Sequence, residues 1–161
     1  MGDDKWHRHV GVYGICKMEG KILVVHKTAG PYRNRYDLPG GTIEPNESVD
    51  QALTREFKEE TGLEIVASKA LGFSEFIVRY TLGDHSHVQH IPLFFQVECK
   101  TENNGTALAY SNDTEGYEWV LLRDINEENS SPLVMKAKDV IAHAAFTYES
   151  KRLDDWVTRE G

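Results

Sequence analysis

The segment between Ser48 and Gly62 is the most tightly specified element in this sequence. Ser48 is a good helix N-cap, and Gln51 three residues later completes a capping box, in which each side chain accepts a hydrogen bond from the other residue's backbone N–H. Gly62 suits the position where many helices end in a left-handed residue. The sequence therefore predicts a helix with fixed ends, so the direction of each side chain between them can be worked out.

Two glutamates lie on the apolar side of this helix. That side is formed by Val49, Ala52, Leu53 and Phe57. At the helical rotation per residue, Glu56 and Glu60 each fall roughly 20° from Val49, Glu59 flanks the apolar side and Lys58 points away from it. A solvated glutamate face does not explain Glu56 and Glu60, because exposing them would also expose the apolar residues. Burying an unpaired charge is very costly, so these carboxylates must pair with protein cations or bind a metal.

Arg55 is the cation nearest to these glutamates. It can neutralise part of the cluster, most readily Glu59, but one guanidinium leaves three carboxylates with excess negative charge. Mg²⁺ accepts hard oxygen ligands, commonly one or two carboxylates with water and substrate phosphate completing an octahedron. The pattern therefore favours Mg²⁺ binding, with Mn²⁺ as an alternative ion, over a purely structural ion-pair cluster.

The charge balance excludes one class of partner and is compatible with another. The chain has 161 residues and a formal charge of −8, which disfavours binding of long nucleic acid through many Lys and Arg contacts to phosphate. An acidic protein can still bind a small phosphorylated molecule when divalent cations lie between the two. We expect one domain over residues 1–161, no membrane span, no signal peptide and a cytoplasmic location. Cys16 and Cys99 are expected to stay reduced and receive no role.

The rest of the chain predicts strands with two interspersed helices, an α/β fold with a mixed sheet. Strands are expected within residues 9–18, 21–26, 63–81, 91–97 and 119–122, the first two joined as a hairpin at Glu19-Gly20. Ser131-Pro132 should begin the second helix. Its core-facing residues are expected to be Leu133, Ala137, Val140, Ile141, Ala144 and Tyr148.

The segment from Gly41 to Leu63 resembles the Nudix box at every fixed position. From Gly41, five residues lead to Glu47 and seven more to Arg55-Glu56, followed by Phe57, Lys58, Glu59-Glu60, Thr61, Gly62 and Leu63. Phe57 is the one mild departure, since an aliphatic residue is commoner there. Similarity to the Nudix hydrolase family implies an α/β/α sandwich and a pyrophosphohydrolase. It also implies metal ligands Glu56, Glu59 and Glu60, an orienting Arg55, and glycines that admit metal and phosphates, Gly40 and Gly41.

The resemblance further implies that water attacks phosphorus in a diphosphate linkage, as the metal neutralises the phosphate oxygens and acidifies the water. Besides Arg55 and Glu59, the catalytic set needs a general base. Glu56 is the first choice, and the alternatives from a late loop are Asp113, Glu115 and Glu118. Each of these three is also explained as a solvated loop acid.

Substrate contacts are less specified. Lys27, Arg33 and Arg35 precede the box and could reach a phosphate, although a solvated loop explains them equally well. Tyr80 either stacks on a base, as in dinucleoside-polyphosphate hydrolases of the family, or packs in the core, which we favour. A zinc site at His85, His87 and His90 is disfavoured, because no cysteine or evident fourth ligand accompanies them.

The favoured substrate is a nucleoside triphosphate or a dinucleoside polyphosphate, within the wider class of nucleoside diphosphates linked to another group. The alternative is a non-catalytic nucleotide-sensing or partner-binding Nudix domain, which the complete set of box glutamates disfavours. An isomerase of the isopentenyl-diphosphate type is disfavoured because no cysteine lies suitably near the box. A homodimer is compatible with the sequence, which does not fix the oligomeric state.

Overall fold

The helix expected between Ser48 and Gly62 runs from Val49 to Thr61 (α1) in the computed structural model, which describes residues 4–100, 110–111 and 114–161. The capping box is formed: the Ser48 hydroxyl accepts from the Gln51 N–H, and the Gln51 side chain accepts from the Ser48 N–H. Gly62 has φ 71° and donates its N–H to the Lys58 carbonyl. Both predicted helix ends are therefore confirmed.

A mixed six-stranded sheet forms the larger β layer. Its strands follow the order β11-β7-β8-β1-β5, and β6 also pairs with β8. The β1–β8 and β7–β11 pairs are parallel and the other pairs are antiparallel. The bounds are β1 Trp6–Ile15, β5 Gly40–Thr42, β6 Ile65–Phe73, β7 Glu75–Leu82, β8 His85–Cys99 and β11 Ser150–Leu153.

A second, antiparallel sheet of five strands has the order β2-β3-β10-β9, with β4 on β3. Its strands are β2 Lys17–Met18, β3 Lys21–Lys27, β4 Tyr36–Asp37, β9 Tyr110–Ser111 and β10 Thr114–Leu121. The hairpin turn at Glu19-Gly20 is confirmed between β2 and β3. The residues before it were expected to pair with β3 as well, yet β1 turns away and pairs with β8 in the other sheet.

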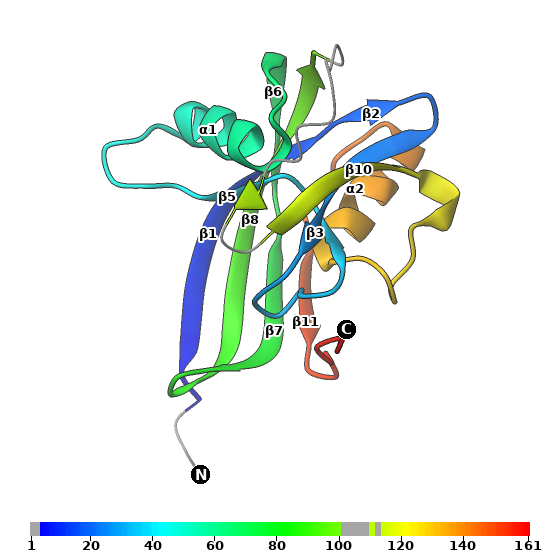
Figure 1. Ribbon diagram of the computed structural model, residues 1–161. Coiled ribbons are helices and arrows are strands. Elements are labelled where there is room, and N and C mark those ends of the chain that lie inside the picture. The colour runs from blue at the N-terminus through cyan, green and yellow to red at the C-terminus, as the bar shows by residue number, and fades with distance from the viewer. Residues whose placement is uncertain (1–3, 101–109, 112–113) are drawn as a thin grey trace.

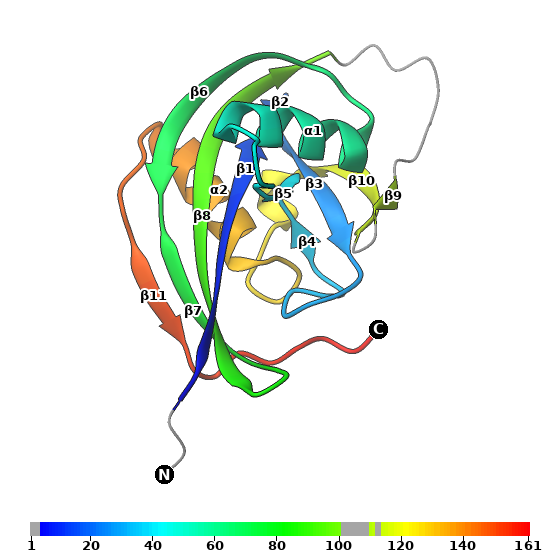
Figure 2. The same ribbon diagram turned by 90° about the vertical axis from the view of Figure 1, so that its left-hand side faces the viewer.

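The two helices lie on opposite sides of the β layers (Figures 1 and 2). One core cluster gathers α1 residues such as Leu53 and Phe57 with Val12 and Leu23. The other gathers residues of α2, Pro132–His143, with strand residues that face the other way. This arrangement confirms the predicted α/β/α sandwich. Neither α1 nor α2, the helices of the described part of the chain, has the length and apolar content to cross a membrane.

The second helix starts as expected and ends earlier. Ser131 caps it through the Val134 N–H, and Pro132 occupies its first turn. Ala144 adopts a left-handed conformation with φ 50°, which ends the helix. Tyr148 was expected to pack in the core as part of this helix, but it lies beyond the helix end, is exposed, and contacts Phe73 on β6. Apolar residues at helical spacing therefore extend beyond Ala144, although the helix itself ends there.

A C-terminal tail follows β11 and was not expected from the sequence. Residues 154–161 leave the lower end of β11 and cross to the loop between β3 and β4, as Figure 2 shows. The contacts are made by side chains and backbone groups on both segments, for example Arg33 with Glu160 and Asn34 with Arg159. The tail therefore packs on the loop that immediately precedes β4 and β5.

Candidate active site

Arg55 is the centre of an acidic cluster on α1. Its Nε and Nη2 donate to the two carboxylate oxygens of Glu47, at 2.6 and 2.9 Å. Its Nη1 donates to Glu56 at 2.8 Å and to Glu59 at 3.3 Å. A further bond from Nη2 to the Thr42 carbonyl, at 3.0 Å, links the helix to β5. One guanidinium thus fixes the loop before the helix and orients two of the three glutamates expected as ligands.

These contacts shift the protonation equilibria in opposite directions. The hydrogen bonds from Arg55 lower the pKa of Glu47 to about 2, and they raise the pKa of Arg55 itself. Burial raises the pKa of Glu56, and it outweighs the lowering effects of Arg55 and of a hydrogen bond with Glu60. The ionised form of Glu47 is therefore stabilised by Arg55, whereas the ionised form of Glu56 is disfavoured by burial despite its bond to Arg55.

The exposure of the three glutamates follows the angular prediction. Glu60 is buried, with 2% of its surface exposed. The side chain of Glu56 is 15% exposed and that of Glu59 is 52% exposed. Glu56 and Glu60 thus lie on the side of α1 that faces the protein, while Glu59 lies at its edge.

Two glycines bring the backbone of β5 close to this cluster. A Cβ atom on Gly41 would lie 2.8 Å from the Glu56 carboxylate. A Cβ atom on Gly40, whose φ is 152°, would lie 2.1 Å from the Val12 carbonyl and 2.7 Å from Tyr13. Only glycine allows this approach. β5 therefore touches the acidic cluster through Gly41 and the neighbouring strand β1 through Gly40.

The cluster fits a divalent cation by its donor set and charge. Glu56, Glu59 and Glu60 supply hard oxygen donors, and burial makes the ionised form of Glu56 less favourable, as its raised pKa indicates. The described residues do not, however, form a ready group of three or more His, Cys, Asp or Glu around one point. Glu59 in particular bonds Arg55 from an exposed position, so its carboxylate has freedom to move towards a cation.

A cavity of about 290 Å³ lies beside β1. Its wall includes the side chain of Tyr13, the residue against which Gly40 packs. The acidic cluster and the cavity therefore flank the same short strand, β5. The other lining residues come from β1, β3, β4, β7, β8 and the loop between β3 and β4, and include His7, His9, Lys27, Pro31, Tyr32, Asp37, Tyr80, Leu82, Val88 and His90.

His90 and two tyrosines form a buried network in the cavity wall. The hydroxyl of Tyr13 lies 2.9 Å from Nε2 of His90, and the hydroxyl of Tyr32 lies 2.8 Å from its Nδ1. Burial lowers the pKa of His90, and nearby His9 and Lys27 lower it further. A neutral imidazole between two hydroxyls has one nitrogen donating and the other accepting. The network therefore holds both tyrosine rings in fixed positions.

The other histidines and Tyr80 occupy distinct places. His87 bonds Ser86 and faces Asp154, and His85 bonds the Leu82 carbonyl. Ring nitrogens of His85, His87 and His90 thus form hydrogen bonds with other groups of the protein. Tyr80 was expected to pack in the core, but it belongs to neither core cluster and lines the cavity.

The three basic residues before the box, Lys27, Arg33 and Arg35, have different surroundings in the structure. Lys27 lines the cavity. Arg33 pairs with Glu160, and Arg35 donates to the carbonyls of Glu127 and Val157. Both arginines therefore contact the C-terminal tail or the segment before α2, and their role as phosphate ligands stays a prediction.

The structure describes the three candidates for a late-loop base to different extents. Glu118 pairs with His26 at 2.9 Å. It alternates along β10 with Tyr117 and Trp119, which pack on the α1 side, so its side chain points to the opposite face. Asp113 lies outside the described residues, and only the backbone of Glu115 is described, in β10. The acid that the structure places beside the glycines is Glu56.

Comparison with known proteins shows the family. A model of the NUDIX domain matches residues 5–144. The chain belongs to the Nudix hydrolase family. This confirms the family predicted from Gly41 to Leu63, and with it the enzyme class, a Nudix pyrophosphohydrolase.

Individual Nudix relatives resemble the chain to different extents. An ADP-ribose pyrophosphatase of Methanocaldococcus jannaschii is 44% identical over 57 residues, which is 35% of this chain and 34% of that protein. The nucleoside triphosphatase NudI of an Enterobacter species is 29% identical over 118 residues, 72% of this chain and 77% of the relative. The crystal structure of a MutT NUDIX hydrolase from Burkholderia pseudomallei aligns over 83% of this chain and 97% of its own, with a TM-score of 0.66 and 19% identity. That structure shows the same fold.

Sequence reasoning named Lys27 and Tyr80 of this Nudix domain's cavity, considered His90 only as a disfavoured zinc ligand, and missed Tyr13, Tyr32 and Asp37. Tyr13, Tyr32 and His90 are far apart in the chain, and their pairing depends on the parallel contact of β1 with β8. Asp37 is buried and accepts a hydrogen bond from the Ser131 hydroxyl at 2.7 Å. Its position in Asp37-Leu-Pro-Gly-Gly, just before the box, was the available signal.

Proposed function

We propose that this Nudix enzyme uses Mg²⁺, or Mn²⁺ in its place, to hydrolyse the diphosphate linkage of a nucleoside diphosphate derivative by attack of water on phosphorus. The observation that carries the proposal is the approach of Gly41 to the Glu56 carboxylate on α1. At this approach a stretch of backbone without a side chain lies against a partly buried carboxylate. A phosphate chain with its cations is a ligand suited to such a place.

The ligands of the ion would be Glu56, Glu59 and Glu60. A bound divalent cation neutralises phosphate oxygens and lowers the pKa of water that it coordinates. Arg55 keeps Glu56 and Glu59 oriented through Nη1. Glu56 is the acid whose carboxylate lies against Gly41 of β5, where a phosphate could approach the backbone. Glu56 is therefore also our choice for the general base.

The cavity beside β5 would take the nucleoside. Tyrosine rings can pack on the flat face of a base, and Tyr13, Tyr32 and Tyr80 all line the cavity. Lys27 supplies a positive charge in the same wall. We favour a nucleoside triphosphate as substrate, because the relative named nucleoside triphosphatase matches over most of both chains. A dinucleoside polyphosphate has the same linkage and is the next choice.

The test of the ligand set is Glu60→Gln. Loss of a buried ligand is expected to lower Mg²⁺-dependent turnover of nucleoside triphosphates by at least about a hundredfold, with folding checked by circular dichroism. Glu64→Gln is the matched control, because Glu64 follows the helix, is exposed and pairs with Lys100. Turnover by Glu60→Gln at the control's rate would remove Glu60 from the site. Absence of Mg²⁺-dependent turnover in the unmodified protein, across tri- and polyphosphate substrates, would refute the proposed function.

The choice of base is tested separately with Glu56→Gln and Glu118→Gln. If Glu56 takes the proton, the first change abolishes the acidic limb of the pH–rate profile along with most of the rate. The second change should leave that limb in place, since Glu118 points away from α1 and pairs with His26. A lost limb in Glu118→Gln alone would transfer the role to Glu118.

A further inference from the structure

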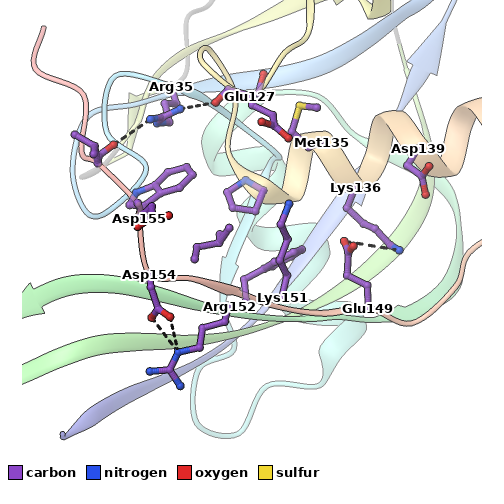
Figure 3. Close-up of a pocket in the computed structure, with 16 residues that line it drawn as sticks. Arg35, Glu127, Met135, Lys136, Asp139, Glu149, Lys151, Arg152, Asp154 and Asp155 are labelled. Carbon is purple, nitrogen blue, oxygen red and sulfur yellow. Dashed lines mark hydrogen bonds and ion pairs between the residues drawn. The ribbon is translucent and has the colours of Figure 1, made fainter.

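Trp156 in the C-terminal tail is attached to the loop that forms part of the cavity wall. Its indole N–H donates to the carbonyl of Pro31, at 2.8 Å. The guanidinium of Arg35 lies over the Trp156 ring, 4.2 Å from its centroid, and donates to the Val157 carbonyl. Figure 3 shows Arg35 lying between Glu127 and the tail. The indole is thus held on one face by a cation and at one edge by backbone.

The same indole contacts Tyr32. The two ring centroids are 5.7 Å apart and the planes are nearly perpendicular, at 80°, a favourable edge-to-face arrangement. Tyr32 is buried, and its hydroxyl bonds His90. Tyr32 is therefore in contact with Trp156 through its ring and with His90 through its hydroxyl.

Tyr32 and Trp156, whose rings are in contact, line two different cavities. Tyr32 lines the cavity beside β5, whereas Trp156 lines a larger cavity of about 550 Å³. The larger cavity is bounded by α2, β11 and the tail (Figure 3), and charged side chains of both signs surround it.

We propose that Trp156 is a positioning residue that fixes Tyr32 as a wall of the nucleoside cavity, so that the C-terminal tail limits which bases the enzyme accepts. This inference rests on the proposed function. It concerns a part of the chain beyond residues 5–144, which the family model matches. Arg35, Trp156 and Tyr32 form one row of contacts from the tail to the cavity, and the tail contributes to selectivity through this row without touching substrate.

The test compares Trp156→Ala and Trp156→Phe with Val157→Ala. Val157 is 71% exposed and its contact with Arg35 uses the backbone carbonyl, so this control keeps the tail in place. Steady-state kinetics with purine and pyrimidine nucleoside triphosphates are measured with Mg²⁺. Trp156→Ala is expected to raise KM for the preferred base by about tenfold, with kcat changed less than about twofold, and to reduce discrimination between the bases.

Trp156→Phe should give an intermediate rise in KM, because phenylalanine keeps an aromatic edge but lacks the donor to Pro31. It also decides the question if Trp156→Ala does not fold. Wild-type KM and discrimination in the folded variants would overturn the inference, as would an equal loss of kcat for every base. Inactivity of the unmodified protein would instead count against the proposed function.

A readout without substrate completes the test. Backbone N–H groups in the loop donate within it, for example Asn34 to the Lys27 carbonyl and Arg33 to that of Gly30. Trp156→Ala should accelerate deuterium exchange in residues 30–36 and leave α1 protected, since α1 is stabilised by its own caps and core contacts. Unchanged exchange in the loop would show that Trp156 does not hold it.

Discussion

Glu47 shows how a residue outside the set of expected metal ligands stabilises the site. Both of its carboxylate oxygens accept hydrogen bonds from Arg55, and the Glu44 N–H donates to one of them. Because Glu47 occupies one side of the guanidinium, Nη1 is left to orient Glu56 and Glu59. The bidentate geometry is specific to arginine, since lysine offers a single ammonium group.

The pKa of Glu47 predicts a pH dependence of stability. It is about 2 in the folded protein against an ordinary value of 4.5. A lowered folded pKa means that the carboxylate stabilises the fold above pH 4.5 and that this contribution is lost as the pH falls towards 2. Glu47→Gln should therefore lower the melting temperature at pH 7 and flatten its decline between pH 4.5 and 2.

Glu44→Gln is the control for this prediction. Glu44 lies in the same loop but is 62% exposed and 3.8 Å from Arg55, so its replacement should change the melting temperature little. Thermal unfolding followed by circular dichroism across this pH range measures both variants. Parallel curves for Glu47→Gln and the unmodified protein would contradict the assignment.

At the scale of elements, the two glycines of β5 are required for different reasons. Gly40 has a left-handed φ and backbone of β1 in front of it, whereas Gly41 faces only the far end of a flexible side chain, the Glu56 carboxylate. Gly40 is required for folding, whereas Gly41 is required for the position of the Glu56 carboxylate. The two residues are adjacent, so they can be compared directly.

Gly40→Ala and Gly41→Ala should therefore separate stability from turnover. Gly40→Ala introduces strain and a clash with the Val12 carbonyl, and should cost about 2 kcal/mol of unfolding free energy or more. Gly41→Ala displaces Glu56, so it should change stability by less than about 1 kcal/mol and reduce Mg²⁺-dependent turnover by at least about tenfold. Denaturant unfolding and kinetics measure the two effects, and a loss of stability in Gly41→Ala equal to that in Gly40→Ala would contradict the distinction.

The elements also show which signals the sequence carries. The ends of α1 and the start of α2 depend on residues three or four positions apart, at Ser48, Gln51 and Ser131, and they were predicted correctly. The burial of Glu60 follows from the same local geometry. In contrast, Ala144 ends α2 in a left-handed conformation that its residue type does not announce, so the end of that helix was placed too late.

At the scale of the whole molecule, pairing between distant segments determined what could not be predicted. The cavity needs Tyr13 from β1, Tyr32 from a loop and His90 from β8, and no local pattern relates them. The tail that holds Arg33 and Arg35 lies more than a hundred residues later in the chain. Spacing before the box suggested a phosphate contact for both arginines, because the sequence does not reveal a tail with acceptors for them.

The parallel pairing of β1 with β8 predicts slow refolding. Arg8 bonds Gln89 across 81 residues of sequence, and ten residue pairs follow the same register. Non-local pairing of this kind requires a large loop to close before contacts stabilise it, so refolding from denaturant should take roughly milliseconds to seconds. Stopped-flow tryptophan fluorescence measures the rate, and full recovery of the native signal within microseconds would contradict this expectation.

The long loop closed by β1 and β8 also has a consequence during synthesis. The register of this pair extends to Gln96, whereas the segment from Gly41 to Leu63 leaves the ribosome earlier. At about 5–20 residues per second, the nascent chain carries all its box glutamates for a few seconds before β1 can acquire its partner. During this interval Val12 has already been made, but Val97, which belongs to the same core cluster as α1, has not. The newly made carboxylate helix therefore depends on its own caps, or on cellular factors that cover its apolar face, until β8 has been translated.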